Sequence, residues 1–282
     1  MLKCRICNSE IPDTVEKCFT CGFYAGLPNV RVAERAEEIQ ALDERYQKAF
    51  DIAKVHGYLS LLEKFDESLK QTSAVINSDL DSLYFFIRSS RSLYSNYERG
   101  VKGQIRKPAA RDDARKRLGV GAILFGDYAD EITYAALSLD GSGPHSYGPY
   151  AMKLKDIAVT NRATLLENNS YDFVPKHNLK PGNKPPPGYI TSWNNRNKLA
   201  VAKLAERITP DTKETDFARL LLFSEGNRAT DEFVEVHIYG TFDSKAVESI
   251  KGSSVNIPED EQHLLRIFKQ HLQRAGIEWI EE

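Results

Sequence analysis

Four cysteines near the start of the chain constrain its fold more than any other feature. They are Cys4, Cys7, Cys18 and Cys21, with the spacing C-x2-C-x10-C-x2-C, and the sequence contains no other cysteine. Paired C-x2-C turns place four thiolates at the corners of a tetrahedron, the geometry that zinc prefers, whereas two disulfides would need an oxidising compartment. We therefore predict a zinc ribbon over residues 1–25 with these cysteines as metal ligands.

The ligand set also indicates what the zinc does. Four protein ligands leave no open coordination position, so we expect a structural ion whose binding drives the folding of the ribbon. Gly22 directly follows the second cysteine pair and suits the tight turn of a zinc knuckle. A redox role for the thiols is the alternative that the spacing leaves open.

The composition describes an ordinary folded protein. The chain has 282 residues, 41% of them hydrophobic and 28% charged, with a net charge of -2. This length allows one large or two modest domains with a real core, and the balance of residues excludes a disordered or fibrous chain. No apolar run reaches the roughly 18 residues of a membrane span, and the first residues lack a signal-peptide core. We expect a cytoplasmic protein that does not contact a membrane.

The region 26–118 follows a helical pattern. Apolar residues recur every three or four positions over 29–57, and related patterns run through 58–76 and 78–100. These patterns predict three helices. The first stops at Gly57, and the third is capped by Ser78 and ends at Gly100.

A basic segment closes this helical region. Its cations are Arg99, Lys102, Arg106, Lys107, Arg111, Arg115, Lys116 and Arg117. Clustered cations attract phosphates, so the segment is a candidate for contact with nucleic acid. A solvated linker is the alternative, because glycines and a proline interrupt the same stretch.

From about residue 119 the pattern becomes rich in strands. Strands are expected within 131–141, 143–157 and 233–242, with 161–173 as a weaker candidate; helices are expected over 192–208, 244–250 and 258–279, and an irregular loop over 175–189. The fold class is therefore α+β. We expect an N-terminal zinc ribbon (1–25), a helical middle region (26–118) and a C-terminal mixed α+β domain (119–282).

One predicted strand has two dissimilar faces. In EFVEVHIYG, residues 232–240, one face is a row of valines and an isoleucine, and the other carries Phe233, Glu235, His237 and Tyr239. An acid and an imidazole between two aromatic rings indicate either the wall of a polar site or a solvated pair on an edge strand. The sequence contains no GxGxxG, GxxxxGK[ST], GxSxG or HExxH pattern, which disfavours those enzyme classes.

Three blocks of the second half resemble the ADP-ribosyltransferase superfamily, in particular its bacterial toxin-like members, some of which modify nucleic acid. The blocks are GSGPHSYGPYAMKLKDI, then NRATLLENNS, then EFVEVHIYG followed by SKAVESI. The resemblance covers residues 120–282. It implies an ADP-ribosyltransferase-like domain that uses NAD as co-substrate.

The resemblance also implies roles for particular residues. His145 or Arg162 would hold NAD, and Tyr147 or the 164–170 region, which begins at Thr164 and ends at Ser170, would line the nicotinamide pocket.

Two residues of the last block would carry the chemistry. Glu235 would be the catalytic carboxylate, because cleavage of the nicotinamide-ribose bond passes through a cationic sugar that a carboxylate stabilises. His237 would orient Glu235 or deprotonate the acceptor. Members with two acids carry Glu or Gln where this chain has Phe233, which argues against protein arginine as the acceptor.

We therefore expect an NAD-dependent ADP-ribosyltransferase that acts on nucleic acid, with RNA favoured, as a toxin or phage-defence effector. The resemblance to toxins also implies an antitoxin or chaperone as a partner. The alternative is a non-enzymatic zinc-ribbon adaptor that binds nucleic acid or protein. Binding of NAD separates these two classes of function, because a ligand that binds only the folded state stabilises it.

Overall fold

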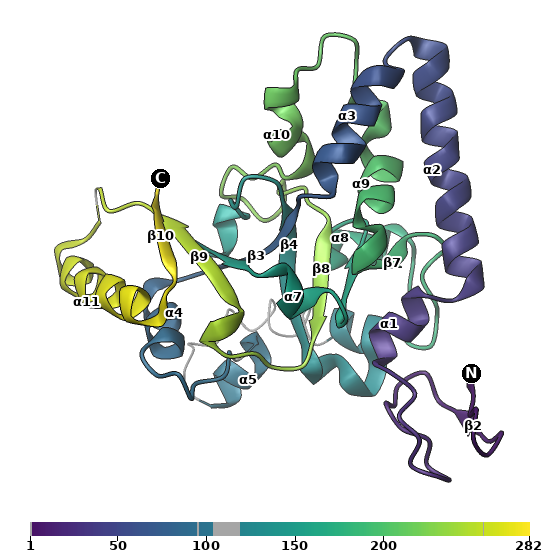
Figure 1. Cartoon of the computed structure of the whole chain (residues 1–282), viewed down its shortest axis with the longest axis horizontal. Helices are drawn as coiled ribbons and strands as arrows, with labels where there is room; N and C mark the ends of the chain where they lie inside the picture. Colours follow the sequence, from purple (N-terminus) through teal and green to yellow (C-terminus); the bar gives the residue numbers. More distant parts are fainter. Residues whose placement is uncertain (1, 95, 104–118, 256) are drawn as a thin grey trace.

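The protein is mixed α+β and is built around one large sheet (Figure 1). The computed structural model describes residues 2–94, 96–103, 119–255 and 257–282, so most of the basic segment lies outside the described residues. The sheet has eight strands in the order β10-β9-β5-β3-β4-β8-β6-β7. Neighbouring strands are antiparallel except for β10 and β9, which are parallel.

The elements follow one another without a repeat. The strands are β1 (Leu2–Lys3), β2 (Glu10–Ile11), β3 (Ser73–Ser78), β4 (Ile132–Ser138), β5 (Tyr150–Leu154), β6 (Ala163–Leu166), β7 (Ile190–Ser192), β8 (Glu235–Tyr239), β9 (Val247–Gly252) and β10 (Glu278–Glu281). The α-helices are α1 (Pro28–Ala33), α2 (Ala36–His56), α3 (Leu59–Leu69), α4 (Leu80–Ile87), α5 (Tyr97–Lys102), α7 (Asp156–Val159), α8 (Ser170–Lys176), α9 (Arg196–Leu204), α10 (Phe217–Leu221) and α11 (Glu259–Ala275). Short 3-10 turns lie at Gly126–Glu131, His145–Tyr147, Trp193–Asn195, Ala205–Arg207, Glu214–Asp216 and Ser244–Ala246.

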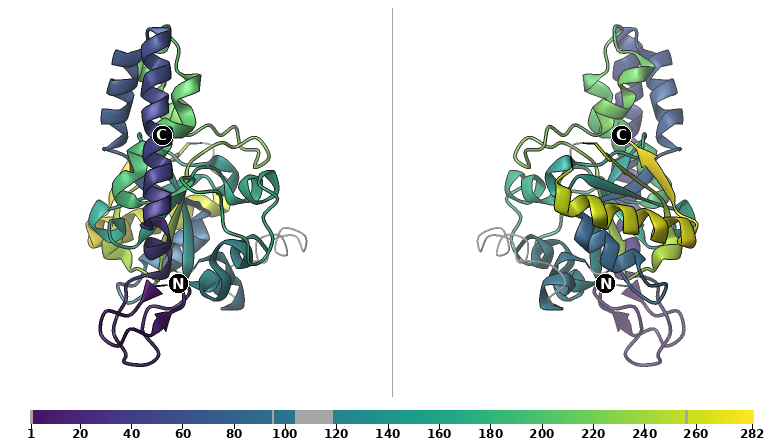
Figure 2. Two further views of the ribbon diagram at one scale, coloured as in Figure 1. Left: turned by 90° about the vertical axis from the view of Figure 1, so that its right-hand side faces the viewer. Right: turned by 90° about the vertical axis from the view of Figure 1, so that its left-hand side faces the viewer.

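The main core lies between the sheet and its helices. Val236 and Ile238 of β8 are fully buried in this core together with Leu62 of α3 and Leu199 of α9, which confirms the apolar row predicted for this strand. The ribbon lies at the opposite end of the molecule from the junction of α2 and α3 at Gly57 (Figures 1 and 2). At the end of the sheet that β9 and β10 form, α11 packs against α4 (Figures 1 and 2).

The middle region contributes a strand as well as helices, so the prediction of a helix over 58–76 is wrong at its end. Residues Ser73–Ser78 form β3, which pairs with β4 on one side and β5 on the other. From Ala74 to Ser78 every residue of β3 is buried. Burial between two strands overrides the helical spacing of this short stretch, since periodicity alone cannot separate a buried strand from a helix.

Two further helical predictions need correction. The helix predicted over 78–100 is divided into α4 and α5, and α4 is capped by Asp79 rather than by Ser78, because the Asp79 side chain accepts the amide of Ser82 at 2.7 Å. The short helix predicted over 244–250 is a 3-10 turn followed by β9. The strands expected within 131–141, 143–157 and 233–242 are confirmed as β4, β5 and β8.

None of the described helices combines the length and the apolar character that a membrane span requires.

A glycine in the β4–β5 loop is required by its surroundings. Gly148 has a φ of +143°, and a Cβ atom added there would lie 2.5 Å from the carbonyl oxygen of Ser78. We expect Gly148→Ala to lower the free energy of unfolding by about 3 kcal/mol, because it combines backbone strain with overpacking. Gly226 is the matched control: its φ is +82° but nothing lies within 4 Å of an added Cβ. Gly226→Ala should lower the free energy of unfolding by only about 1 kcal/mol. Equal losses in urea unfolding would contradict this assignment.

Candidate functional site

The two cysteine pairs form equivalent turns. The amide of Asn8 donates to the carbonyl of Cys4 at 3.0 Å, and the amide of Gly22 donates to the carbonyl of Cys18 at 2.9 Å. Asn8 and Gly22 have φ values of 59° and 73°, so the chain turns through the left-handed region directly after each pair.

The four cysteine sulfurs converge on one point. Sγ of Cys4 lies 3.5 Å from that of Cys21, Sγ of Cys7 lies 3.5 Å from that of Cys18, and all four lie within 4.8 Å of one another. Zn–S bonds of about 2.3 Å in a tetrahedron place the sulfurs about 3.8 Å apart. The cluster can therefore hold a metal ion such as zinc.

The ribbon is attached to the body through α1 and the start of α2. Nη2 of Arg31 donates to the carbonyls of Pro12, Asp13 and Val15 at 3.0, 3.2 and 2.8 Å. Arg35, four residues further on, forms an ion pair with the carboxylate of Asp13. One guanidinium thus binds three carbonyls of a segment that has almost no regular structure of its own.

Arg31→Met tests this attachment, because methionine keeps much of the aliphatic stem and removes every donor. We expect protease cleavage around residues 25–27 to become at least tenfold faster, since a hydrogen-bonded charged group contributes about 1.5–3 kcal/mol. The zinc content should stay unchanged. Arg5→Met is the control, because Arg5 is an exposed ribbon residue whose guanidinium lies 5.9 Å from the Phe23 ring. Cleavage of both variants at the wild-type rate would contradict the role of Arg31.

The acid and the imidazole of β8 are buried together. Glu235 and His237 are 5% and 2% exposed, and β8 lies between β4 and β6 rather than at an edge, so the solvated edge-strand alternative is wrong. Nε2 of His237 lies 3.0 Å from Oε2 of Glu235, and the backbone amide of Ser170 donates to the same oxygen at 2.9 Å. These contacts fix the carboxylate in one orientation.

Two aromatic rings that also contact each other pack edge-on against the imidazole. The ring centroids of Phe125 and Tyr134 lie 4.8 and 5.3 Å from that of His237, with interplanar angles of 81° and 84°. Thr164 of β6 lies opposite His237 in the sheet. Asn29 of α1 donates to both the hydroxyl of Thr164 and the carbonyl of His237 at 3.4 Å. The imidazole is therefore held behind Glu235, away from solvent.

A small cavity lies beside Glu235. It measures about 60 Å³, and its walls include Asn77, Tyr134, Tyr147 and Phe233. The rings of Tyr147 and Phe233 meet edge to face, with centroids 6.3 Å apart and an interplanar angle of 88°. A dry cavity of about 150 Å³ accepts benzene, so in this conformation the space admits only groups of about the size of water molecules.

Asn77 is the residue of this cavity that the sequence did not indicate. It is 9% exposed, and its Nδ2 donates to the carbonyl of Gly148 at 2.9 Å. Its Oδ1 is buried and accepts no hydrogen bond from the described residues. An unpaired buried acceptor costs about 1–3 kcal/mol, and this oxygen is packed against Gly143, where an added Cβ would lie 1.8 Å from it. No sequence signal pointed to Asn77, because the helices expected over 58–76 and 78–100 placed it in the connection between them.

Charged groups of both signs lie near Glu235. Burial first, and then the carboxylates of Glu235 and Glu232, raise the pKa of Asp172. Desolvation lowers the pKa of Lys203 to about 8, and its ammonium donates to the carbonyl of Phe233 at 3.0 Å. Of these groups only Glu235 lines the cavity, so its carboxylate is the one that can stabilise a positive charge there.

The structure brings some of the predicted site residues together and leaves others apart. Tyr147 and Glu235 line the cavity, and Ser170 and His237 bind the carboxylate. His145 is exposed and lies outside the cavity wall, with Nε2 4.0 Å from the Glu282 carboxylate.

Arg162 lies away from the Glu235 cavity, directly before β6. Its Nε donates to the carbonyl of Ala158 at 2.6 Å and its Nη1 to the carbonyl of Thr241 at 2.8 Å, and burial lowers its pKa. Arg162 therefore supports the backbone next to β6 and does not line the Glu235 cavity. Its side chain contributes instead to a larger cleft beside the zinc ribbon.

No protein-family model and no curated protein sequence matches the chain.

Proposed function

We propose that the protein is an NAD-dependent ADP-ribosyltransferase that modifies nucleic acid, with RNA as the first candidate. The observation that carries the proposal is the carboxylate of Glu235, which is buried at the wall of a cavity with one oxygen held by Ser170 and His237. A fixed carboxylate in a dry site stabilises a developing positive charge better than a mobile one in water.

The reaction needs a group that stabilises a cationic ribose. As the bond from the nicotinamide nitrogen to the ribose carbon breaks, its electron pair leaves with nicotinamide. A hydroxyl or amine of the acceptor then bonds to that carbon and releases its proton. We assign Oε1 of Glu235 to the ribose 2'-hydroxyl, because both hydrogen bonds from the described residues go to Oε2. The same carboxylate can accept the proton that the acceptor releases and pass it to water.

His237 has an orienting role in this proposal. Its ring is 2% exposed and packs against Phe125 and Tyr134, so an acceptor has no direct path to it. Of the two roles that the sequence left open, the geometry favours orientation of Glu235 over deprotonation of the acceptor.

Asn77 and Tyr147 supply the binding features. The unpaired Oδ1 of Asn77 suits the amide N–H of a carboxamide once the segment that carries Gly143 moves away from it. The rings of Tyr147 and Phe233 suit a planar heterocycle. The cavity of about 60 Å³ is too small for that ring, so binding requires one wall to move. We expect Tyr147 to move, because it is half-buried, whereas Phe233 is only 3% exposed.

A second candidate function is a non-enzymatic zinc-ribbon adaptor that binds nucleic acid. The small volume of the Glu235 cavity favours it, as does the larger cleft of about 860 Å³ beside the ribbon. In this case Glu235 and His237 form a buried structural pair. The protein would then have no transferase activity, and so no role as a toxin or defence effector that an antitoxin restrains.

Incubation of the zinc-loaded protein with labelled NAD separates the two candidates. Separate pools of RNA, DNA and cell protein serve as acceptors, and thermal unfolding is followed at rising NAD concentration. We expect label in the RNA pool and a higher melting temperature with NAD, because NAD binds only the folded chain. The absence of both label and thermal shift at millimolar NAD would reject the transferase in favour of the adaptor.

A further inference from the structure

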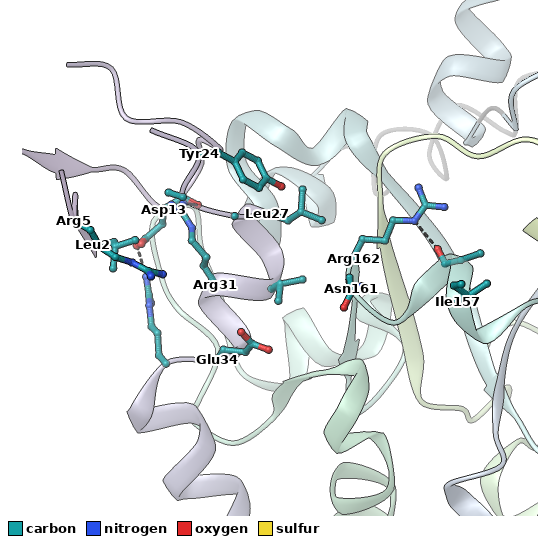
Figure 3. A pocket seen from close by; sticks show the side chains of 15 residues that line it. Leu2, Arg5, Asp13, Tyr24, Leu27, Arg31, Glu34, Ile157, Asn161 and Arg162 are labelled. Atoms are coloured by element: carbon teal, nitrogen blue, oxygen red, sulfur yellow. Dashed lines mark hydrogen bonds and ion pairs between the residues drawn. The ribbon is translucent and has the colours of Figure 1, made fainter. Parts of the chain in front are cut away.

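A large cleft separates the zinc ribbon from the body of the protein (Figure 3). It measures about 860 Å³, within the range of about 300–1,000 Å³ that ligand sites occupy. One wall comes from the ribbon and α1, and the other comes from α7 and the turn before β6. Figure 3 shows Leu2 and Arg5 at one side, and Ile157 and Arg162 at the other.

The cleft is positively charged, although the chain as a whole is not. Its lining contains four arginines, Arg5, Arg31, Arg35 and Arg162, and two carboxylates, Asp13 and Glu34. The net charge of the chain is -2, so this excess of positive charge is local. It favours an anionic ligand.

Arg5 and Arg31 differ in whether a ligand can reach their guanidinium groups. Arg5 is exposed and stands at the rim of the cleft. Nε and Nη1 of Arg31 are buried and find no hydrogen-bond partner among the described residues, so only Nη2 is used to hold the ribbon. The charge of Arg31 therefore acts on the cleft as a fixed field rather than through direct contact.

The same cleft exposes apolar and aromatic surface. Tyr24 is 52% exposed, Leu2 is 43% exposed and Ile157 is 86% exposed. A positively charged groove with an accessible aromatic ring is the arrangement by which proteins bind single-stranded nucleic acid, since bases stack on the ring and phosphates meet the cations. An acidic peptide would match the charge but has no planar base for Tyr24.

We propose that this cleft binds single-stranded nucleic acid, with a base stacked on Tyr24 and a phosphate held by Arg5. The cleft borders the proposed catalytic strand, because Asn29, beside Val30 and Arg31 of the cleft wall, donates to the carbonyl of His237 at 3.4 Å. Binding in this cleft needs no NAD and is independent of the proposed transferase function.

Fluorescence anisotropy with the zinc-loaded full chain, without NAD, tests the cleft. The probe is a labelled single-stranded RNA of about 12 nucleotides, which is within the site sizes of such proteins. We expect Arg5→Ala and Tyr24→Ala each to weaken binding about tenfold. Arg5→Ala should also reduce the slope of log K against log salt by about 0.7, because one phosphate contact is lost, whereas Tyr24→Ala should leave the slope unchanged.

Arg219→Ala is the matched control. Arg219 is exposed and lies 5.2 Å from the Phe223 ring, much as Arg5 lies 5.9 Å from the Phe23 ring. It belongs to α10, at the opposite end of the molecule from the ribbon (Figure 1). Its substitution should leave the affinity for RNA unchanged, and zinc content shows that each ribbon variant is folded.

Three outcomes would overturn the proposal. The first is wild-type affinity in both cleft variants. The second is loss of binding only when Arg115, Lys116 and Arg117 are changed to Glu, which would assign binding to the basic segment. The third is displacement of the RNA by an equal concentration of polyglutamate, which would assign the cleft to acidic peptides. If RNA binding is retained but no label is transferred, the proposed enzymatic activity is rejected and the proposed binding in the cleft stands.

Discussion

Chelation of the metal, or the substitution Cys21→Ser, is expected to unfold residues 2–25 and to leave the large sheet folded. The ribbon contains two strands of two residues each and a buried cluster of only Cys4, Ile11 and Cys18. A core of this size cannot stabilise a fold by itself. Structural zinc contributes about 10–16 kcal/mol in small zinc domains, so its loss should remove all of the order in the ribbon.

Metal analysis should give one zinc per chain for the wild type and less than one-tenth of that for Cys21→Ser. Hydrogen exchange should then be fast throughout the ribbon and unchanged in β4 and β8. Phe19→Ser is the control, because Phe19 lies in the same knuckle and is 79% exposed. It should keep its zinc. A freshly purified wild type with less than one zinc per chain, or a ribbon that stays protected after chelation, would refute the metal site.

The features that the sequence predicts best are those that depend on near neighbours. Cys4 and Cys7 form one turn, and Cys18 and Cys21 form the other, so the spacing alone predicts the two turns that hold the four sulfurs. Likewise, Glu235 and His237 must share a face of any strand that contains both, because side chains alternate along a strand. Their hydrogen bond follows from that local rule.

Other features depend on strand pairing between distant segments. Asn77 reaches the Glu235 cavity only because β3 lies beside β4, and no local pattern predicts that pairing. Ser170 meets Glu235 across 65 residues of sequence. The resemblance implies contact of His145 or Arg162 with NAD, but backbone carbonyls near β6 use donors of Arg162, and no local pattern predicts those contacts.

The dependence on strand pairing also explains why the sequence predicts a wholly helical middle region, although the region contains β3. The residues of β3 include Val75 and Ile76, which favour strands, but they follow the amphipathic helix α3 after only three residues, Lys70 to Thr72. The apolar spacing of α3 therefore continues into β3, and the sequence pattern does not show where the helix ends and the strand begins. Only the partners on both sides of β3 decide its conformation.

The largest effect on activity is expected from Glu235→Gln, which should reduce transfer of ADP-ribose about 100- to 1,000-fold and change NAD affinity by no more than a few fold. Glutamine keeps the size of the side chain and an oxygen that can accept the amide of Ser170, which lies 2.9 Å away. It loses the negative charge, which matters most when the ribose becomes cationic in the transition state. Loss of rate without loss of binding is the signature of such a group.

Glu232→Gln is the matched control for this substitution. Glu232 lies three residues before Glu235 but is exposed, and it forms an ion pair with Arg207 at the surface. An exposed pair contributes about 0–1 kcal/mol, so this variant should keep both its stability and its rate.

His237 separates an orienting role from a direct catalytic one. His237→Gln retains a donor for Glu235, so it should keep more activity than His237→Ala, which also leaves a cavity beside Phe125 and Tyr134. Both variants should lose less rate than Glu235→Gln, because the imidazole acts through the carboxylate. If Glu235→Gln kept full activity, or if it unfolded the chain while His237→Gln did not, the pair would be structural. The chemistry would then have to be sought outside β8.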